Sequence, residues 1–295
     1  MSVRYRVEHQ TRYVYSTRVS TSQHVACLRP RELPTQRVHA FAISYGPEPS
    51  QISERIDYFG NWAEHFTILT PHAEMCVTSR SEVEVEPRSV DIDSERSVPW
   101  EAVRDSLVYR KGTGAGEAAQ FAYASPYVEH DPRMAEYAAP AFATGTPILA
   151  AALALMHRIH EDFTFDATAT TVTTPVTKVL AERRGVCQDF AHLQISCLRS
   201  LGLAARYVSG YLLTAPPPGQ PRLLGADASH AWVSVFCPPV GWVDVDPTND
   251  VLADERHVTV AWGRDYGDVS PLRGVILGGG QHALHVGVSV VPVTA

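Results

Sequence analysis

The 295-residue sequence has no long apolar run and no recognisable apolar segment of a secretory signal. Residues 1–8 alternate charged and apolar side chains, and no later stretch is long and apolar enough to cross a bilayer as a helix. These absences argue against insertion into a membrane. We therefore expect a cytoplasmic protein that has no membrane partner.

Strong charge of one sign is also missing. The sequence has 25 basic and 32 acidic residues, which give a formal net charge of −7, and it contains no block of like charges. Proteins that bind phosphate backbones usually carry a basic cluster, so we expect no nucleic-acid partner. The 45% of hydrophobic and 19% of charged residues are typical of a globular protein, and the length favours two domains.

Cysteine is scarce and unpaired. The chain has an odd number of cysteines, widely spread and with no C-x-x-C pair: Cys27, Cys76, Cys187, Cys197 and Cys237. This pattern fits reduced thiols better than a disulfide framework or a cysteine zinc site. His157 and His160 flank a helical turn beside two acidic residues, but the sequence places no further ligand near them. We expect no metal and no cofactor.

A period of two dominates the first ninety or so residues and predicts β-strands. Two runs of alternating apolar residues carry this pattern, namely Tyr5, Val7, Tyr13 and Tyr15, and Met75, Val77, Val83 and Val85. The segment Asp57-Tyr58-Phe59-Gly60-Asn61 predicts a turn between strands. We expect an antiparallel β-domain over residues 1–95 with one face buried.

Helical patterns follow the β-domain. Residues 96–145 predict a helical connector interrupted by Gly112, Gly114, Pro126 and Pro132. Residues 147–163 predict a strong helix that begins near a proline. A second helix begins near Cys187, carries apolar residues at three-and-four spacing, and stops at Gly202.

Strand patterns return after Gly202, at residues 205–213, 230–237, 242–246 and 284–291. Helices followed by an antiparallel sheet define an α+β core, which we place at residues 146–295. The segment Ala215–Ala228 is expected to be a loop that influences specificity.

Cys187 stands where a glycine-containing turn gives way to a helix, in Arg184-Gly185-Val186-Cys187-Gln188-Asp189. Free N–H groups and the helix dipole favour an anion there, so the thiol should ionise more readily than the reference pKa of about 8.5. The backbone N–H of Cys187 is then the natural first donor to an oxyanion, and no second donor can be identified.

Strand parity predicts partners for this thiol. Residues 230–236 and 242–246 flank Pro238-Pro239-Val240-Gly241 and form a predicted hairpin. In any register that pairs even residues with even ones, His230 and Asp246 share a face, either directly opposite or diagonal. Asp246 would orient His230, and His230 would share the proton of Cys187. Asp244 lies on the same face, so parity alone cannot separate it from Asp246.

These residues, read in order, resemble the transglutaminase-like core of bacterial proteins. The matching motifs are Gly185-Val186-Cys187-Gln188-Asp189-Phe190-Ala191-His192, Arg206-Tyr207-Val208-Ser209-Gly210-Tyr211, His230-Ala231-Trp232 and Gly241-Trp242-Val243-Asp244-Val245-Asp246-Pro247-Thr248. Residues 57–61 resemble the β-domain that precedes this core in the bacterial family, and residues 263–266 resemble its carboxy-terminal segment. The resemblance covers nearly the whole chain.

The resemblance implies a papain-like cysteine-enzyme fold, with Cys187 as nucleophile, His230 as general base and Asp246 as orienting acid. It leaves the substrate open, because the superfamily includes crosslinkers, peptidases and glycan-removing amidases. This sequence lacks the paired C-x-x-C zinc ligands of the amidases and has Gln188 where animal crosslinkers carry an aromatic residue. Both departures favour a hydrolase that acts on a peptide or protein amide.

Several alternatives stay open at this stage. The protein could transfer the acyl group to a lysine amine, or it could be an inactive binding scaffold, and homo-oligomerisation is undecided. Among the other polar residues, His192 is expected to form a surface pair with Asp189. Asp189 is expected to stabilise the helix start, and the four cysteines other than Cys187 to pack in the interior.

Overall fold

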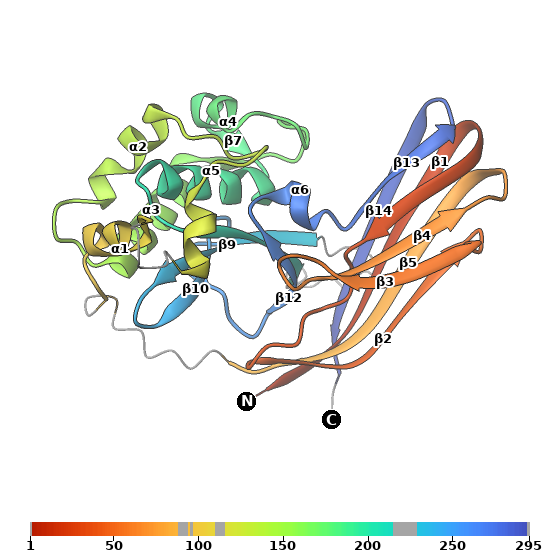
Figure 1. Cartoon of the computed structure of the whole chain (residues 1–295), viewed down its shortest axis with the longest axis horizontal. Coiled ribbons are helices and arrows are strands. Elements are labelled where there is room, and N and C mark those ends of the chain that lie inside the picture. The colour runs from red at the N-terminus through yellow and green to blue at the C-terminus, as the bar shows by residue number, and fades with distance from the viewer. Residues whose placement is uncertain (1, 88–93, 95–96, 110–115, 215–228, 294–295) are drawn as a thin grey trace, which may run out of the picture.

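The computed structural model describes residues 2–87, 94, 97–109, 116–214 and 229–293. Within these ranges the chain forms an antiparallel β-sheet domain beside a core of helices packed on a second sheet (Figure 1). The expected α+β class is confirmed. Gly112, Gly114 and the Ala215–Ala228 segment lie outside the described residues.

The N-terminal sheet is antiparallel throughout, as the alternating pattern predicted. Its strands are β1 (Val3–Ala26), β2 (Gln36–Gly46), β3 (Gln51–Ile56), β4 (Trp62–Ile68) and β5 (His72–Val85), joined by β13 (Leu272–Gly278) and β14 (His282–Pro292). The turn expected at residues 57–61 connects β3 with β4.

This sheet folds over at its middle. One half of β1 pairs with β5 and β14, and the other half pairs with β4 and β13, with register shifts between Val14 and Val19. The two halves therefore face each other (Figure 1). Tyr45 from one half packs on Phe66 from the other, with ring centroids 4.7 Å apart. An apolar core fills the space between the halves.

The last two strands differ from the expectation. We placed residues 284–291 in the sheet of the core, as part of a unit over residues 146–295. The segment is a strand, β14, but it pairs with β1 of the N-terminal sheet, and β13 does the same. Period two specifies a strand and its buried face but says nothing about which edge it will join.

The helical pieces expected before the core are present. They are α1 (Trp100–Leu107), η2 (Glu117–Ala122), α2 (Pro132–Ala138) and η3 (Ala139–Ala141), followed by α3 (Ile148–Asp162) and α4 (Val176–Glu182). The short strands β6 (Thr164–Phe165) and β7 (Arg184–Gly185) then lead into α5 (Cys187–Ser200). Both predicted helices, α3 and α5, therefore form.

The core sheet has the order β11-β10-β9-β8-β12 and lies against α5 (Figure 1). Its strands are β8 (Ala205–Leu212), β9 (Ser229–Cys237), β10 (Gly241–Asp246), β11 (Val251–Leu252) and β12 (His257–Gly263), and α6 (Tyr266–Val269) follows them. Helices α2, α3 and α4 cover the rest of α5, whose residues from Asp189 to Arg199 are all buried. The cysteine-bearing helix is thus central, with packing on all sides.

Side-chain hydrogen bonds connect the N-terminal domain to the core sheet. Asn61, which is 0% exposed, accepts from the Trp262 N–H at 3.0 Å and donates to the Trp262 carbonyl at 2.8 Å. Gln36 forms a similar pair with the backbone of Thr259. His9 lies 3.0 Å from the Tyr211 hydroxyl, and burial lowers the pKa of His9 to about 4. These polar pairs stand beside apolar contacts, because buried side chains of β1, β5 and β14 belong to one apolar cluster with those of the core.

Helices that could cross a membrane are not found in the part of the chain that the structure describes, because none combines sufficient length with sufficient apolar character.

We expect Asn61→Ala to destabilise the protein by about 3 kcal/mol, because both backbone groups of Trp262 would be left buried without partners. Guanidinium unfolding of the full chain measures this change. Tyr58→Ala in the same turn is the matched control, since Tyr58 is 80% exposed and its loss should cost less than about 0.5 kcal/mol. Equal losses of stability in the two variants would show that the hydrogen bonds of Asn61 do not hold the N-terminal domain against the core sheet.

Candidate active site at the start of helix α5

Cys187 is the first residue of α5, as the sequence predicted, and its side chain is partly exposed. The helix start is held by Asp189, whose carboxylate accepts the Val186 N–H at 2.8 Å and the Thr170 hydroxyl at 2.6 Å. Burial raises the pKa of Asp189, although both hydrogen bonds oppose this rise. Asp189 therefore has the structural role that was expected.

Gly185 makes this helix start sterically feasible. A Cβ at this position would lie 2.7 Å from Asp189 Oδ2 and 2.9 Å from Asp189 Cβ, so any larger residue would displace the capping carboxylate. In the described ranges, no acceptor is found for the backbone N–H of Cys187. This N–H remains open to an incoming acceptor beside the thiol.

His230, near the start of β9, lies beside Asp246, at the end of β10. His230 Nε2 lies 2.7 Å from Asp246 Oδ2. The register pairs Val245 with Val233, so the next step places Asp246 beside Trp232, and His230 reaches the carboxylate diagonally. The shared face that parity predicted is present, in the diagonal arrangement of the two that were open.

Asp246 is 0% exposed and accepts hydrogen bonds at both oxygens. The Thr248 and Asn249 N–H groups donate to Oδ1 at 2.9 and 3.3 Å. Oδ2 receives His230 Nε2 at 2.7 Å, Asn249 Nδ2 at 2.7 Å and His257 Nε2 at 3.2 Å. Burial alone would raise the pKa of Asp246, but the bonds from His230 and His257 outweigh it and lower that pKa. The group is therefore a carboxylate at neutral pH.

His230 is correspondingly cationic in character. Burial would lower its pKa, yet hydrogen bonds with Asp246 and Cys187 and the charges of both groups raise the pKa of His230 to about 10. Because Nε2 faces Asp246, Nδ1 is the ring nitrogen left for the cysteine side. The arrangement can hold a proton on the imidazole next to a sulfur nucleophile.

Two further residues belong to this network and were not identified from the sequence. Asn249 donates to Asp246 and also lies 3.3 Å from His230 Nε2. His257 is fully buried, its Nδ1 lies 3.1 Å from both the N–H and the Oδ1 of Asp254, and its Nε2 lies 3.2 Å from Asp246 Oδ2.

Strand parity within the hairpin gave His230 as a partner of Asp246 and gave no sign of His257. The chain reverses after β10, where Val251 pairs with Asp246, and it reaches β12 at His257. Parity within one hairpin cannot reveal a residue that arrives from another strand. The only available signal was proximity in sequence to Asp246.

Asp244, which parity could not separate from Asp246, accepts a hydrogen bond from a different ring, that of Trp232. Its Oδ2 accepts Trp232 Nε1 at 3.1 Å. The buried Trp232 ring lies near His230, with centroids 6.2 Å apart and planes 30° apart. Gly210 faces His230 on β8, and a Cβ at Gly210 would lie 2.5 Å from the Trp232 ring. Trp232 therefore forms a wall beside the imidazole.

The expected surface pair between His192 and Asp189 is wrong. His192 is buried, accepts the Tyr266 N–H at Nε2 at 3.1 Å, and stacks near Tyr127 with centroids 5.7 Å apart. Burial lowers the pKa of His192 to about 3, so the ring is neutral. A position one helical turn from Asp189 is on the surface only if that helix face is exposed, and α5 is enclosed.

Three of the remaining cysteines, Cys27, Cys197 and Cys237, are buried, whereas Cys187 is partly exposed. Burial raises the pKa of Cys27 to about 11 and of Cys237 to about 12, and it raises that of Cys197 as well. Cys76 on β5 is partly exposed. The interior packing expected for the other cysteines therefore holds for three of them.

Metal ligation has limited support in the described residues. His157 lies 2.7 Å from Asp250, and His160 lies 3.0 Å from the Thr248 carbonyl, so these two rings have other partners. One trio, His230, Asp246 and His257, brings three possible ligand atoms within 4.8 Å of one another. Both imidazoles direct a nitrogen at the same carboxylate oxygen, which fits a hydrogen-bond network, and an ion would have to displace those protons.

Comparison with known proteins identifies both parts of the chain. Residues 5–84 match the bacterial transglutaminase-like N-terminal region, and residues 135–247 match the transglutaminase-like superfamily. The second match contains Cys187, His230 and Asp246. The sequence resemblance is thus supported over two separate regions.

Three relatives illustrate the similarity. An uncharacterised protein of Mycobacterium tuberculosis is 42% identical over 296 residues, covering 98% of this chain and 93% of that protein. The protein-glutamine gamma-glutamyltransferase of Pseudomonas aeruginosa is 40% identical over 75 residues, covering 25% of this chain and 11% of that protein. The crystal structure of a candidate cysteine protease from Cytophaga hutchinsonii has a TM-score of 0.79 at 18% identity, covering 100% of this chain and 92% of that one, which shows the shared fold.

We expect Asp246→Asn to lower the pKa of His230 from about 10, because only Cys187 would then oppose the effect of burial. The raised pKa stabilises the fold below pH 6.5, and this contribution is lost as pH rises through about 10. The depressed pKa of Asp246 adds stability above pH 3.8 that is lost as pH falls.

The cost of this substitution should therefore be largest between about pH 4 and 6.5, at about 3 kcal/mol, and smaller at either extreme. NMR titration of the His230 ring and urea unfolding across pH measure both effects. An unchanged His230 pKa, or a cost independent of pH, would contradict the assignment of Asp246.

His257→Gln should raise the pKa of His230 slightly, because a weaker hydrogen bond from position 257 makes the Asp246 carboxylate a stronger acceptor for the His230 imidazole. The glutamine amide can still donate a hydrogen bond, so His257→Leu should have the larger effect. The same NMR titration measures both variants. Equal behaviour of the glutamine and leucine variants would show that the ring only fills space.

Proposed function

Since the chain belongs to the bacterial transglutaminase-like family, we propose that it is a cysteine-dependent hydrolase of a peptide or protein amide. The observation that carries this proposal is the meeting of Cys187 with the His230–Asp246 pair at the start of a buried helix. In these roles Cys187 is the nucleophile, His230 the acid and base, and Asp246 the residue that orients the imidazole.

The first half of the reaction is acylation. The Cys187 thiolate attacks the amide carbonyl carbon, and the carbon–oxygen π electrons move to the oxygen to give a tetrahedral oxyanion. The open N–H of Cys187 is placed to donate to this oxygen. The intermediate collapses as the carbon–nitrogen bond breaks, and the amine leaves with the proton from His230 Nδ1. The products are a thioester on Cys187 and a neutral imidazole.

The second half is hydrolysis of that thioester. Neutral His230 accepts a proton from water as the water oxygen attacks the thioester carbon. The second tetrahedral intermediate breaks the carbon–sulfur bond, which releases the acid and restores the thiolate beside the imidazolium. Asp246 stays ionised in both halves of the reaction. It stabilises the cationic His230 ring without itself taking the proton.

Amine transfer is the competing function. The Pseudomonas relative that bears the name of a glutamyltransferase matches a quarter of this chain and supports it. Both reactions share the thioester and differ only in whether water or a lysine amine attacks it. Gln188 favours hydrolysis in the sequence comparison. Its side chain donates to the Val172 carbonyl at 3.2 Å. We also propose that the protein is located in the cytoplasm.

Cys187→Ala should abolish release of ammonia or peptide fragments from a responsive peptide library, a loss of at least about a thousandfold. Cys76→Ala, which removes another partly exposed thiol, should leave activity unchanged. Adding a labelled primary amine separates the two chemistries, because a transferase incorporates the label and a hydrolase does not. Retained activity in Cys187→Ala would contradict both.

Iodoacetamide labelling tests the scaffold alternative. At pH 6 to 7, Cys187 should react at least about tenfold faster than Cys76, because a cationic His230 stabilises its thiolate. His230→Ala should remove this preference. Equal labelling of Cys187 and Cys76 in the unaltered protein would favour a scaffold without catalytic function.

A further inference from the structure

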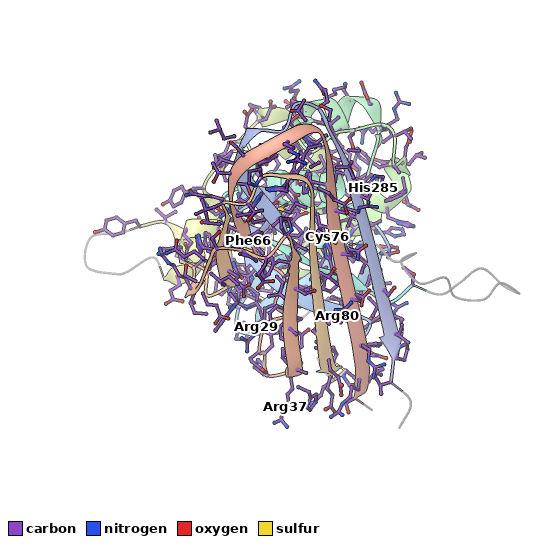
Figure 2. All side chains as sticks on the ribbon, turned by 90° about the vertical axis from the view of Figure 1, so that its right-hand side faces the viewer. Arg29, Arg37, Phe66, Cys76, Arg80 and His285 are labelled. Carbon is purple, nitrogen blue, oxygen red and sulfur yellow. The ribbon has the colours of Figure 1, made fainter. Side chains whose placement is uncertain are left out.

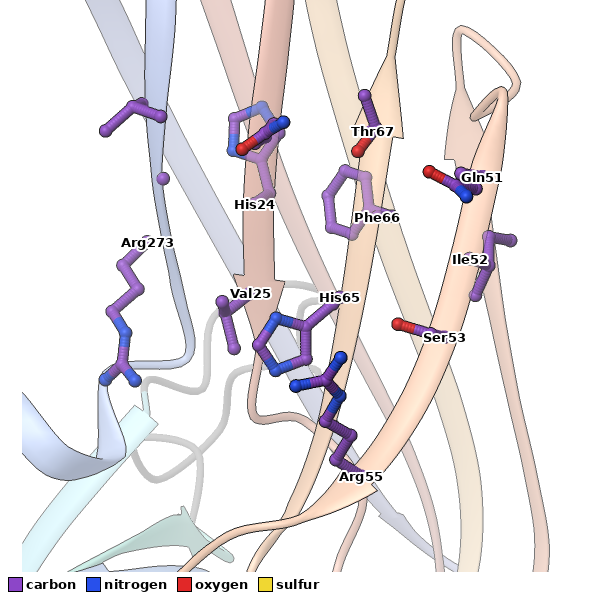
Figure 3. Close-up of a pocket in the computed structure, with 13 residues that line it drawn as sticks. His24, Val25, Gln51, Ile52, Ser53, Arg55, His65, Phe66, Thr67 and Arg273 are labelled. Carbon is purple, nitrogen blue, oxygen red and sulfur yellow. The ribbon is translucent and has the colours of Figure 1, made fainter.

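A groove lies on the N-terminal domain, away from the residues of the candidate active site. It has a volume of about 720 Å³ and opens on the outer face of strands β3, β4, β1 and β13 (Figure 3). We call it the outer groove and define it by its outward-facing side chains, which are Gln23, Val25, Gln51, Ser53, Arg55, His65, Thr67, Arg273 and Val275.

The strand registers set these side chains in rows across the sheet. Thr67 on β4 faces Gln51 on β3 and Gln23 on β1. In the next row His65 faces Ser53 and Val25, and Val25 faces Arg273 on β13. Neighbours in such rows lie about 5 Å apart, so an extended ligand that crosses the strands would meet a polar group at nearly every step.

The charge of the outer groove is one-sided. Its lining includes Arg55, His65 and Arg273 but no aspartate or glutamate. Within the described ranges, Arg55 and His65 form no hydrogen bond or ion pair, and Figure 3 shows their side chains side by side. Arg273 is held by the Gly267 carbonyl at 2.6 Å. The two arginines of the outer groove therefore face no carboxylate in its lining.

The other half of the same sheet shows the contrast. On its outer face Arg12 binds Glu74 at 2.6 Å, and Arg80 binds Glu8 at 2.6 Å. Cross-strand pairing of opposite charges is the ordinary arrangement on a solvated sheet. The outer groove departs from it, because it presents arginine without a carboxylate.

The outer groove is also connected to the candidate active site. Arg273 contacts α6 through the Gly267 carbonyl, and the neighbouring Tyr266 N–H donates to His192 of α5 at 3.1 Å. One four-residue helix therefore links the outer groove to the helix that begins with Cys187. A polypeptide held in the outer groove would be retained near that helix.

We propose that the outer groove binds an acidic segment of the polypeptide substrate, an inference that rests on the proposed peptide hydrolase. Carboxylates of the segment pair with Arg55 and Arg273, and Gln51, Gln23 and Thr67 bind its backbone. A nucleic acid fits less well, because the outward-facing lining offers no phenylalanine, tyrosine or tryptophan ring for stacking.

The test measures binding separately from catalysis. The full chain carrying Cys187→Ala is titrated into a fluorescein-labelled peptide of about ten alternating glutamates and serines, and anisotropy is recorded at low and physiological salt. The matched neutral peptide has glutamine in place of glutamate. We expect the acidic peptide to bind at least about tenfold more tightly, with affinity falling as salt rises.

Arg55→Glu should weaken this binding at least about fivefold, since a charge that attracts becomes one that repels. Arg55 is exposed, so the fold should tolerate the change. Arg37→Glu is the matched control, because it makes the same charge change on β2, far from Phe66 of the groove strand β4 (Figure 2). It should leave the affinity unchanged.

Three results would overturn the proposal: equal binding of the neutral peptide, no effect of Arg55→Glu, or tighter binding of single-stranded oligothymidylate than of the acidic peptide. A dimer in solution that Arg55→Glu separates would also overturn it, since the occupant would then be a second copy. If binding behaves as expected but no peptide is cleaved by the unaltered protein, the proposed hydrolase fails while the outer groove stands.

Discussion

The buried carboxylate of Asp246 is the group on which the candidate site depends. A carboxylate with no exposed surface is stable only when donors compensate its charge, and here two imidazoles, one amide and two backbone N–H groups do so. The same charge raises the pKa of His230. The local fold and the proposed chemistry therefore both depend on the compensated charge of Asp246. A substitution that removes this buried charge would also remove a group that raises the pKa of His230.

The N-terminal domain supports this arrangement from outside. His9 on β1 meets Tyr211 on β8, and Tyr211 pairs with Ser229, the residue before His230. Further bonds fix the same domain to β12, which begins at His257. Both histidines that approach Asp246 therefore stand on strands that the N-terminal domain contacts directly or through a neighbour. The domain is part of the scaffold of the site as well as the carrier of the outer groove.

Periodic patterns made much of this structure predictable. Alternation gave the strands and the shared face of His230 and Asp246, and the glycine turn before Cys187 gave the start of α5. The errors arose where a contact depends on segments distant in sequence. The partner of β14, the buried position of His192 and the approach of His257 follow from how the sheets assemble, which no local pattern encodes. The diagonal register also required the structure, because parity permitted two arrangements.

The most direct measurement is mass spectrometry of the protein quenched in acid during incubation with a peptide library. The account predicts an acyl group attached to Cys187 as a thioester, with a mass that identifies the peptide from which it came. It also predicts that the adduct accumulates when water attack is slowed and is absent in His230→Ala. Peptide cleavage without any adduct on Cys187, or an adduct on a different cysteine, would contradict the account.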